Sequence, residues 1–146
     1  MTPAWAKALF AFGEAMAFSV LFGIPRNKLV PAGLSGMLSW SVYSGALWLG
    51  TGRLAAAFLG AAFGSAYAEL AARRLRVPVT IFIVPTTIPL VPGYDVYSSM
   101  LAFLRGQNTE GFDTAIGAML LALSIAAGIV AVATLFRIKP SKNRLT

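Results

Sequence analysis

The sequence predicts an all-α integral membrane protein with five transmembrane helices, the fourth of them discontinuous at a P-L-V-P-G break. Hydrophobic residues make up 58% of the 146 residues and charged residues 12%, about half of the roughly 25% that soluble domains carry. The positive residues lie in short stretches between apolar segments of membrane-spanning length. One of these segments contains the stretch Val84–Tyr97, V-P-T-T-I-P-L-V-P-G-Y-D-V-Y. We therefore expect residues 1–146 to form a single multi-pass membrane domain.

The first predicted span covers residues 3–24. Pro3 suits the first turn of a helix, where its missing N–H costs nothing. Glu14 falls near the middle of this span, and a buried carboxylate at that depth is costly. Glu14 is therefore either a proton-carrying or substrate-facing acid, or a neutral or hydrogen-bonded carboxyl that helps helices to pack.

The second and third predicted spans, residues 29–50 and 54–72, are rich in small residues. The second follows a basic turn, I-P-R-N-K, and its glycines and serines favour close packing over a polar pathway. In the third, Gly60 and Gly64 form a G-x-x-x-G pair within a stripe of small residues at every fourth position. This pair predicts a close helix contact without saying which partner makes it.

The fourth predicted span, residues 77–104, carries the break. Pro85, Pro89 and Pro92 each remove a backbone donor and clash with the preceding turn, and Gly93 permits unusual backbone angles. About 28 residues exceed the roughly 20 that a straight span needs, which leaves room for an unwound middle. Freed backbone groups persist at membrane depth only against protein or a watery cavity. The segment is thus a discontinuous helix at a mid-membrane transport site, a kinked helix, or a loop between two short elements.

The residues around this break supply the candidate site. Helix N-termini at the break offer amide donors to a substrate carboxylate, and hydroxyl groups can bind its polar atoms. Asp95 can meet a substrate ammonium or carry a coupling proton. The predicted substrate-binding residues are Thr86, Thr87, Pro89, Pro92, Gly93, Tyr94, Asp95 and Tyr97. The proton-coupling candidates are Asp95 and Glu14, and the helix-packing residues are Gly60 and Gly64.

The fifth predicted span, residues 114–136, follows a polar loop at Arg105–Asp113 and precedes a basic tail cut off by Pro140. Five crossings put nine basic residues on one side of the membrane and three on the other, whereas a re-entrant fourth segment gives six against six. The nine are Arg26, Lys28, Arg73, Arg74, Arg76, Arg137, Lys139, Lys142 and Arg144, and the three are Lys7, Arg53 and Arg105. The positive-inside rule then predicts an outside N-terminus and a cytoplasmic C-terminus in the cell (inner) membrane.

Composition also argues against several function classes. The chain has no cysteine and no histidine and only five carboxylates, so we expect no thiolate chemistry, metal site or cofactor. No nucleophile–base set is recognisable, and we expect no enzyme. The net charge of +7 lies in short caps between apolar segments, which is a membrane pattern and not a nucleic-acid-binding face.

The run F-x-x-P-x-x-I-P-L-V-P-G-x-x-x-Y, from Phe82 to Tyr97, resembles the threonine/serine exporter family. The small size and the F-G-I-P-R entry to the second span make the chain similar to the small subunit of the split, two-component form. The resemblance implies export of small metabolites, either threonine/serine-type amino acids or dicarboxylates such as succinate. It also implies a larger partner subunit, and Asp95 stands where the family is expected to have a small polar residue.

We therefore expect the membrane subunit of a secondary exporter, embedded in the lipid bilayer and acting with a larger subunit or as a homo-oligomer. With no nucleotide site in the sequence, ion gradients or the gradient of the small-molecule substrate itself would drive export. The alternative is a non-transporting scaffold or assembly subunit whose small-residue faces serve only packing. A scaffold has no need for unwound backbone at membrane depth, so the broken segment favours the exporter.

Overall fold

The structure, a computed structural model, describes residues 4–138, and this part of the chain is helical without any strand. The predictions for Pro3 and for the tail residues Lys139, Pro140, Lys142 and Arg144 concern positions outside the described residues. The elements are α1 (Ala4–Leu21), the 3₁₀ turn η1 (Arg26–Lys28), α2 (Leu29–Trp48), α3 (Arg53–Leu75), α4 (Thr80–Thr87), the 3₁₀ turn η2 (Ile88–Leu90), α5 (Gly93–Leu104) and α6 (Asn108–Ile138).

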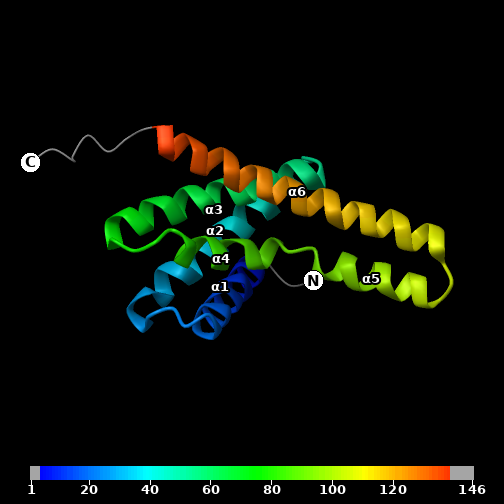
Figure 1. The fold of residues 1–146 in the computed structure, drawn as a ribbon, viewed down its shortest axis with the longest axis horizontal. Helices are drawn as coiled ribbons and strands as arrows, with labels where there is room; N and C mark the ends of the chain where they lie inside the picture. Colours follow the sequence, from blue (N-terminus) through cyan, green and yellow to red (C-terminus); the bar gives the residue numbers. More distant parts are fainter. Residues whose placement is uncertain (1–3, 139–146) are drawn as a thin grey trace, which may run out of the picture.

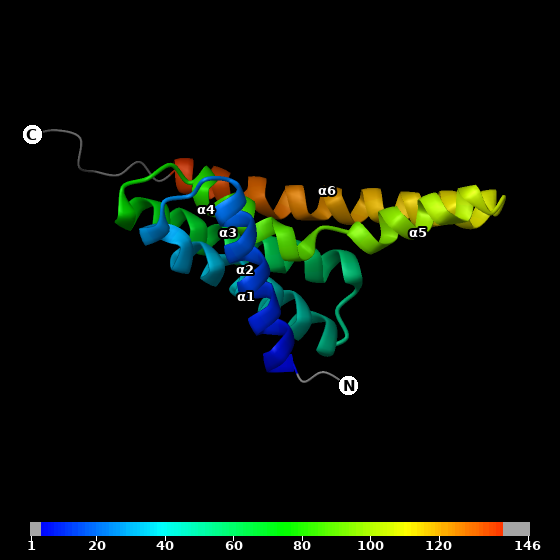
Figure 2. The same cartoon turned by 90° about the horizontal axis from the view of Figure 1, so that it is seen from below.

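The helices form a bundle with an arm. The bundle contains α1, α2, α3 and α4, while α6 runs along the length of the molecule and packs against α3 (Figure 1). The short helix α5 lies antiparallel to the first half of α6, and the two extend away from the bundle as a helical hairpin (Figure 2). The break between α4 and α5 therefore lies where the bundle meets the arm.

The first three helices begin and end close to the predicted spans, but the last one does not. The predicted polar loop Arg105–Asp113 is wrong, because α6 already begins at Asn108. Only a short turn remains, and Gly106 makes it with a φ of 76°, a conformation that favours glycine. Glu110 lies in the first turn of α6, where a carboxylate interacts favourably with the positive end of the helix dipole. Polar residues thus begin the helix instead of separating two helices.

The predicted break in the fourth segment is confirmed. Helix α4 ends at Thr87, η2 adds one tight turn, and Val91 is extended, with φ −59° and ψ 130°. Pro92 has φ −76° and ψ 51°, and the Gly93 N–H donates to the Val91 carbonyl at 2.8 Å. These angles and this bond describe an inverse γ-turn, after which α5 begins at once.

Small residues bring the helices together, as the sequence predicts. A Cβ atom added to Gly60 would lie 2.9 Å from the Ser39 carbonyl oxygen on α2, and one added to Gly64 would overlap the Thr86 methyl on α4. The Ser39 hydroxyl donates to the Gly60 carbonyl at 3.0 Å. The G-x-x-x-G pair is therefore filled by the protein's own α2 and α4.

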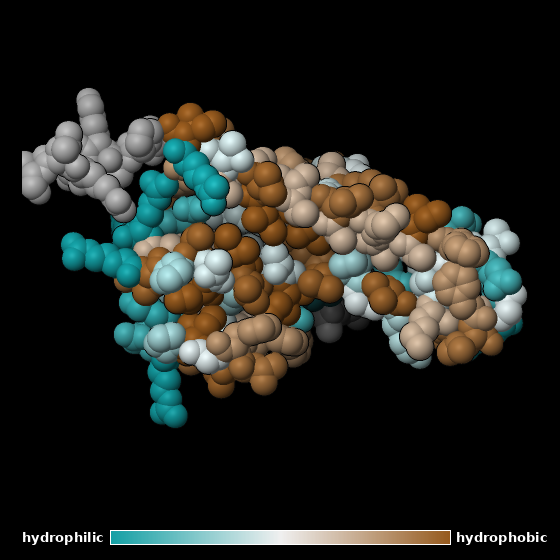
Figure 3. Space-filling model, in the orientation of Figure 1, coloured by the Kyte–Doolittle hydropathy of each residue, from teal (hydrophilic) through white to brown (hydrophobic). Residues whose placement is uncertain are grey.

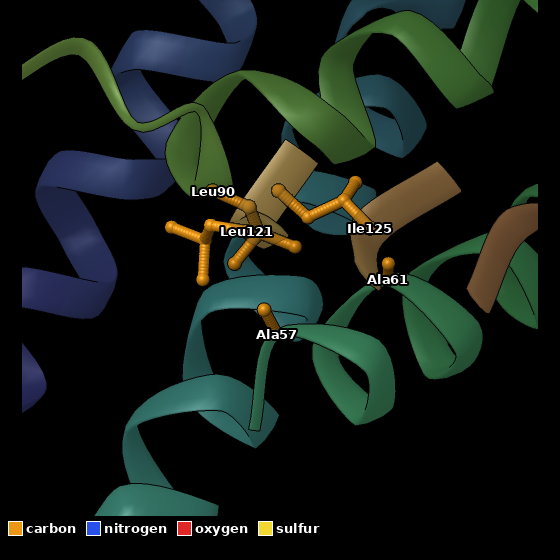
Figure 4. Packing of buried hydrophobic residues seen from close by; sticks show 5 residues of the cluster. All are labelled: Ala57, Ala61, Leu90, Leu121 and Ile125. Carbon is orange, nitrogen blue, oxygen red and sulfur yellow. The ribbon is translucent and has the colours of Figure 1, made fainter. Parts of the chain in front are cut away.

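A compact apolar cluster joins the break to the long helices. Leu90 of η2 packs between α3 and α6, and all five members of the cluster are almost completely buried (Figure 4). The cluster consists of Ala57, Ala61, Leu90, Leu121 and Ile125. Because Leu90 immediately precedes the extended Val91, this contact fixes the position at which the helix is interrupted.

Two helices, α3 and α6, are long and apolar enough to cross a membrane. The 23 residues of α3 span about 35 Å, which matches a hydrocarbon core of roughly 30 Å. Large apolar side chains are exposed on every helix from α1 to α6. Hydrophilic side chains gather at the end of the molecule where α3 ends, and the space-filling view shows an otherwise largely apolar face (Figure 3).

Candidate functional site

A cavity of about 160 Å³ lies at the break. Its walls come from α2, α3, η2, the break itself, α5 and α6. The lining residues are Trp40, Tyr43, Arg53, Pro89, Leu90, Val91, Pro92, Tyr94 and Leu121. Its volume is that of about five water molecules and lies below the roughly 300–1,000 Å³ of pockets for drug-sized ligands. The cavity therefore matches a small metabolite.

Arg53 and Asp95 form an ion pair beside this cavity. Arg53 Nη2 donates to Asp95 Oδ2 at 2.5 Å, and the pair joins the first residue of α3 to the first turn of α5. The Asp95 side chain is only 11% exposed, whereas the Arg53 side chain is 55% exposed. A buried carboxylate needs such a partner, since an unpaired charge is costly. The ion pair thus holds the beginning of α5 against the beginning of α3.

Sequence reasoning missed Arg53 as a site residue and placed it only in a turn between two spans. It also missed Trp40 and Tyr43, which lie one helical turn apart on α2 with ring centroids 5.4 Å apart. The Trp40 indole Nε1 is buried and has no hydrogen-bond acceptor among the described residues. The available signals were the one-turn spacing of the two aromatic residues and a lone arginine at the start of a small-residue helix.

The prolines leave backbone groups without helical partners at the break. Because Pro89 has no N–H, the Pro85 carbonyl lacks the bond that normally comes from four residues further on. Pro92 leaves the Ile88 carbonyl in the same state, and the Val91 N–H bonds it instead at 3.2 Å. The first N–H groups of α5, beyond Gly93, have no acceptor within their own helix. The break therefore offers both backbone donors and backbone acceptors.

The structure brings together only some of the predicted substrate-binding residues. Pro89, Pro92 and Tyr94 line the break cavity. Thr86 is buried in the bundle, where its hydroxyl donates to the Phe82 carbonyl at 2.8 Å. The Thr87 hydroxyl donates to the Val84 carbonyl at 2.9 Å, and the 63% exposed Tyr97 is not among the lining residues. Neither threonine lines the cavity.

The expectation that only glycine fits at position 93 is wrong. Gly93 does not have a positive φ, and a Cβ atom added there meets nothing within 4 Å. The physical reason is that Pro92 makes the sharp change of direction, so Gly93 is already the first helical residue of α5. The break depends on proline and does not need glycine conformational freedom.

Glu14 lies away from the break. It is exposed on α1, whose buried residues include Ala11, Ala15 and Ser19. Neither Glu14 nor Asp95 is among the residues that line the break cavity, although Asp95 pairs with the lining residue Arg53. Within residues 4–138, no group of three or more carboxylates is placed to hold a metal ion.

Three larger cavities lie elsewhere on the surface. One of about 290 Å³ lies between α5 and α6 and shares Pro92 with the break cavity, but it has no charged lining residue. Two others, of about 410 and 500 Å³, lie along α2 with α3 and along α1 with α2. The break cavity is smaller than these, but it alone among the four combines interrupted backbone with a charged side chain.

An all-helical chain with an apolar surface, helices of membrane-spanning length and a small polar cavity at a broken helix has the architecture of a membrane transport protein. The sequence profile of the threonine/serine exporter family matches residues 7–135, and the chain belongs to this family of membrane exporters. The predicted resemblance is confirmed.

A threonine/serine exporter of Corynebacterium glutamicum is 32% identical to this chain over 117 residues. The match covers 80% of this chain but only 24% of that relative, so the chain spans about a quarter of the relative's length. No solved structure matches the chain.

Proposed function

We propose that this chain is the membrane subunit of a secondary exporter of small metabolites and that the break cavity is part of its substrate path. The observation that carries the proposal is the cavity itself, which is lined by the interrupted backbone at Val91 and Pro92 and by the charged side chain of Arg53. Membership of the exporter family supports it. Threonine/serine-type amino acids and dicarboxylates such as succinate are the two candidate substrate classes.

The proposed topology has five crossings, made by α1, α2, α3, the α4–α5 pair and α6. It places the N-terminus outside and the C-terminus in the cytoplasm. The basic residues of η1, the end of α3 and the end of α6 support this orientation. The ends of α3 and α6 are adjacent, since Arg73 Nη2 donates to the Phe136 carbonyl at 2.9 Å and the Arg73 guanidinium lies 4.8 Å from the Phe136 ring centroid. Asp95, and less directly Glu14, are the candidates for proton coupling.

We further propose that the exporter is completed by a larger subunit of the same family or by further copies of this chain. The relative that matches is about four times as long as the matched region. In addition, α5 packs mainly against α6, and the arm that they form extends beyond the bundle (Figure 2). Apolar side chains on the arm, such as Tyr97, Met100 and Met119, are more than half exposed. A partner or lipid would cover them.

Metabolite efflux from cells tests the proposal. Cells are loaded with threonine or succinate, and efflux is measured with the chain alone, with the product of its chromosomal neighbour alone, and with both. We expect efflux only when this chain is present, with the partner raising it. If the partner alone exports at the full rate and this chain only raises its abundance in the membrane, the chain is a scaffold and the proposed function is wrong.

A further inference from the structure

We propose that the cavity between α2 and the end of α3 is a binding site for one anionic phospholipid. The Arg74 guanidinium binds the phosphate of the headgroup, and an acyl chain lies along the apolar wall that α3 provides. The inference does not depend on what the chain exports, because it needs only a chain that is embedded in a bilayer.

The cavity is a groove of about 410 Å³ along one face of α3. Most of its lining residues recur at spacings of three and four positions, which place side chains on the same face of a helix. On α3 they are Tyr67, Leu70, Ala71, Arg74 and Leu75, and Pro31 in the first turn of α2 forms the opposite wall. All of these side chains are apolar except Arg74 and the phenol of Tyr67. The groove is thus an apolar surface with a cation near the end of the helix.

The length of the groove matches an acyl chain in one leaflet. Tyr67 and Arg74 are seven positions apart, which is about 10 Å along a helix. The hydrocarbon part of one leaflet is about 15 Å thick, half of the roughly 30 Å core. Helix α3 is long and apolar enough to cross a membrane, and Arg74 lies in its last turn. An acyl chain parallel to α3 therefore places its phosphate at the level of Arg74.

The two neighbouring arginines at the end of α3 have different surroundings. Arg73 is held on the α6 side, where it donates to the Phe136 carbonyl at 2.9 Å and lies 3.8 Å from the Glu69 carboxylate. Arg74 is exposed, lines the groove on the α2 side and pairs with no carboxylate among residues 4–138. Arg74 is therefore open to an anionic ligand.

Further positive charge lies at this end of the groove. Lys28 directly precedes α2, and Ala32 of α2 belongs to one buried cluster with Ala72 of α3, so the start of α2 lies beside the end of α3. Hydrophilic side chains gather at this end of the molecule (Figure 3). Basic pockets between transmembrane helices bind the headgroups of anionic lipids. Among the described residues no carboxylate lines the groove, so the amine or choline of a zwitterionic lipid would find no partner there.

Lipid titrations of the wild-type full chain give the first test. The chain is purified in detergent, together with its partner subunit where the two copurify, and bound lipids are counted by native mass spectrometry. The probes are dioleoyl phosphatidylglycerol, dioleoyl phosphatidylcholine and soluble glycerol phosphate, which has the charge without the acyl chains. We expect one phosphatidylglycerol per chain to bind at least about fivefold more tightly than phosphatidylcholine, without competition from glycerol phosphate. Equal binding of the two lipids, or displacement by glycerol phosphate, overturns the proposal.

Two variants separate the headgroup from the acyl chain. Arg74→Gln should lower the affinity for phosphatidylglycerol at least about fivefold and leave the affinity for phosphatidylcholine unchanged. Ala71→Phe should weaken the binding of both lipids, because the new ring fills the groove. Size-exclusion profiles establish that each variant is folded, and the wild-type titrations decide the question without any variant.

Matched controls change exposed residues that do not line the groove. Arg137→Gln removes the same charge at the same end of the bundle, and Ala55→Phe adds the same ring near the other end of α3. Neither should change the binding of either lipid. A loss of phosphatidylglycerol affinity in Arg137→Gln as large as that in Arg74→Gln would indicate a general attraction of anionic lipids to a basic surface, and the specific site would be wrong.

A helix of a partner protein in the groove would give a different result. If Arg74→Gln or Ala71→Phe releases a copurifying partner subunit while phosphatidylglycerol binding stays at the wild-type level, the groove is a protein interface and the lipid site is wrong. If lipid binding falls while the partner stays bound, the lipid site is supported. Efflux enters neither outcome, so a failure of the proposed function is distinguishable from a failure of this inference.

Discussion

The carbonyl oxygen of Pro85 faces the backbone of Gly36 so closely that a Cβ atom on Gly36 would lie 2.9 Å from it. This carbonyl is the one that Pro89 leaves without a helical hydrogen-bond donor. The missing side chain at Gly36 therefore lets α2 cover a polar group that would otherwise face lipid or an empty space. The proline break in α4 and a glycine in α2, far apart in the sequence, form one structural unit.

This contact predicts that Gly36→Ala destabilises the protein. The new methyl group would also lie 2.5 Å from the Ala15 Cβ, so backbone as well as side chains must move. We expect a loss of about 1–3 kcal/mol in the free energy of unfolding, measured as a lower midpoint of thermal unfolding in detergent. Gly45→Ala on the same helix is the control, since its Cβ meets nothing within 4 Å. Equal midpoints for the two variants would contradict the role of Gly36.

A second prediction concerns Gly64 and its contact with Thr86. Gly64→Ala should destabilise the subunit itself, by about 1–3 kcal/mol, because the new Cβ would overlap the Thr86 methyl. Adding Thr86→Ser removes that methyl but keeps a hydroxyl for the Phe82 carbonyl. The double variant should therefore recover part of the loss in thermal unfolding. The sequence alone leaves open which partner meets this stripe. Loss of oligomer with an unchanged unfolding midpoint would indicate a contact between subunits instead of one within the subunit.

The break predicts different outcomes for its glycine and its prolines. Gly93→Ala should leave efflux unchanged and stabilise the protein by up to about 1 kcal/mol, because Gly93 has helical angles and open space. Pro89→Ala should lower efflux, since it returns an N–H to the Pro85 carbonyl and lets α4 extend toward Pro92. Efflux at matched membrane abundance is the measurement. A defect in Gly93→Ala together with normal efflux in Pro89→Ala would reverse this explanation of the break.

The five-crossing topology is tested by reporter fusions. Reporters that are active only outside the cytoplasm should work when fused at the turn around Gly106 and fail when fused after Ile138. Reporters that are active only in the cytoplasm should give the opposite pattern and serve as the control. The expectation rests on nine basic residues on one side against three on the other. An active external reporter after Ile138 would contradict five crossings.

The sequence by itself determined the helical class, the family, the small-residue helix contact and the position of the break. These features depend on properties that are local in the chain. Prolines at positions 85, 89 and 92 remove backbone donors in any environment, and Gly60 and Gly64 lie on one helix face because of the helical period. The P-L-V-P-G run carries the family signal for the same reason.

Only the tertiary structure decided which residues meet at the break. Arg53 and Asp95 are 42 positions apart and pair because α3 and α5 begin side by side, and no spacing rule in the sequence expresses that proximity. The structure also shows that Gly93 is the first helical residue of α5, because the change of direction takes place at Pro92. An acid inside an apolar segment predicts that a partner is present. Which residue that partner is depends on how the helices pack, because a charged group pairs with a residue that is near in space and not necessarily near in the chain.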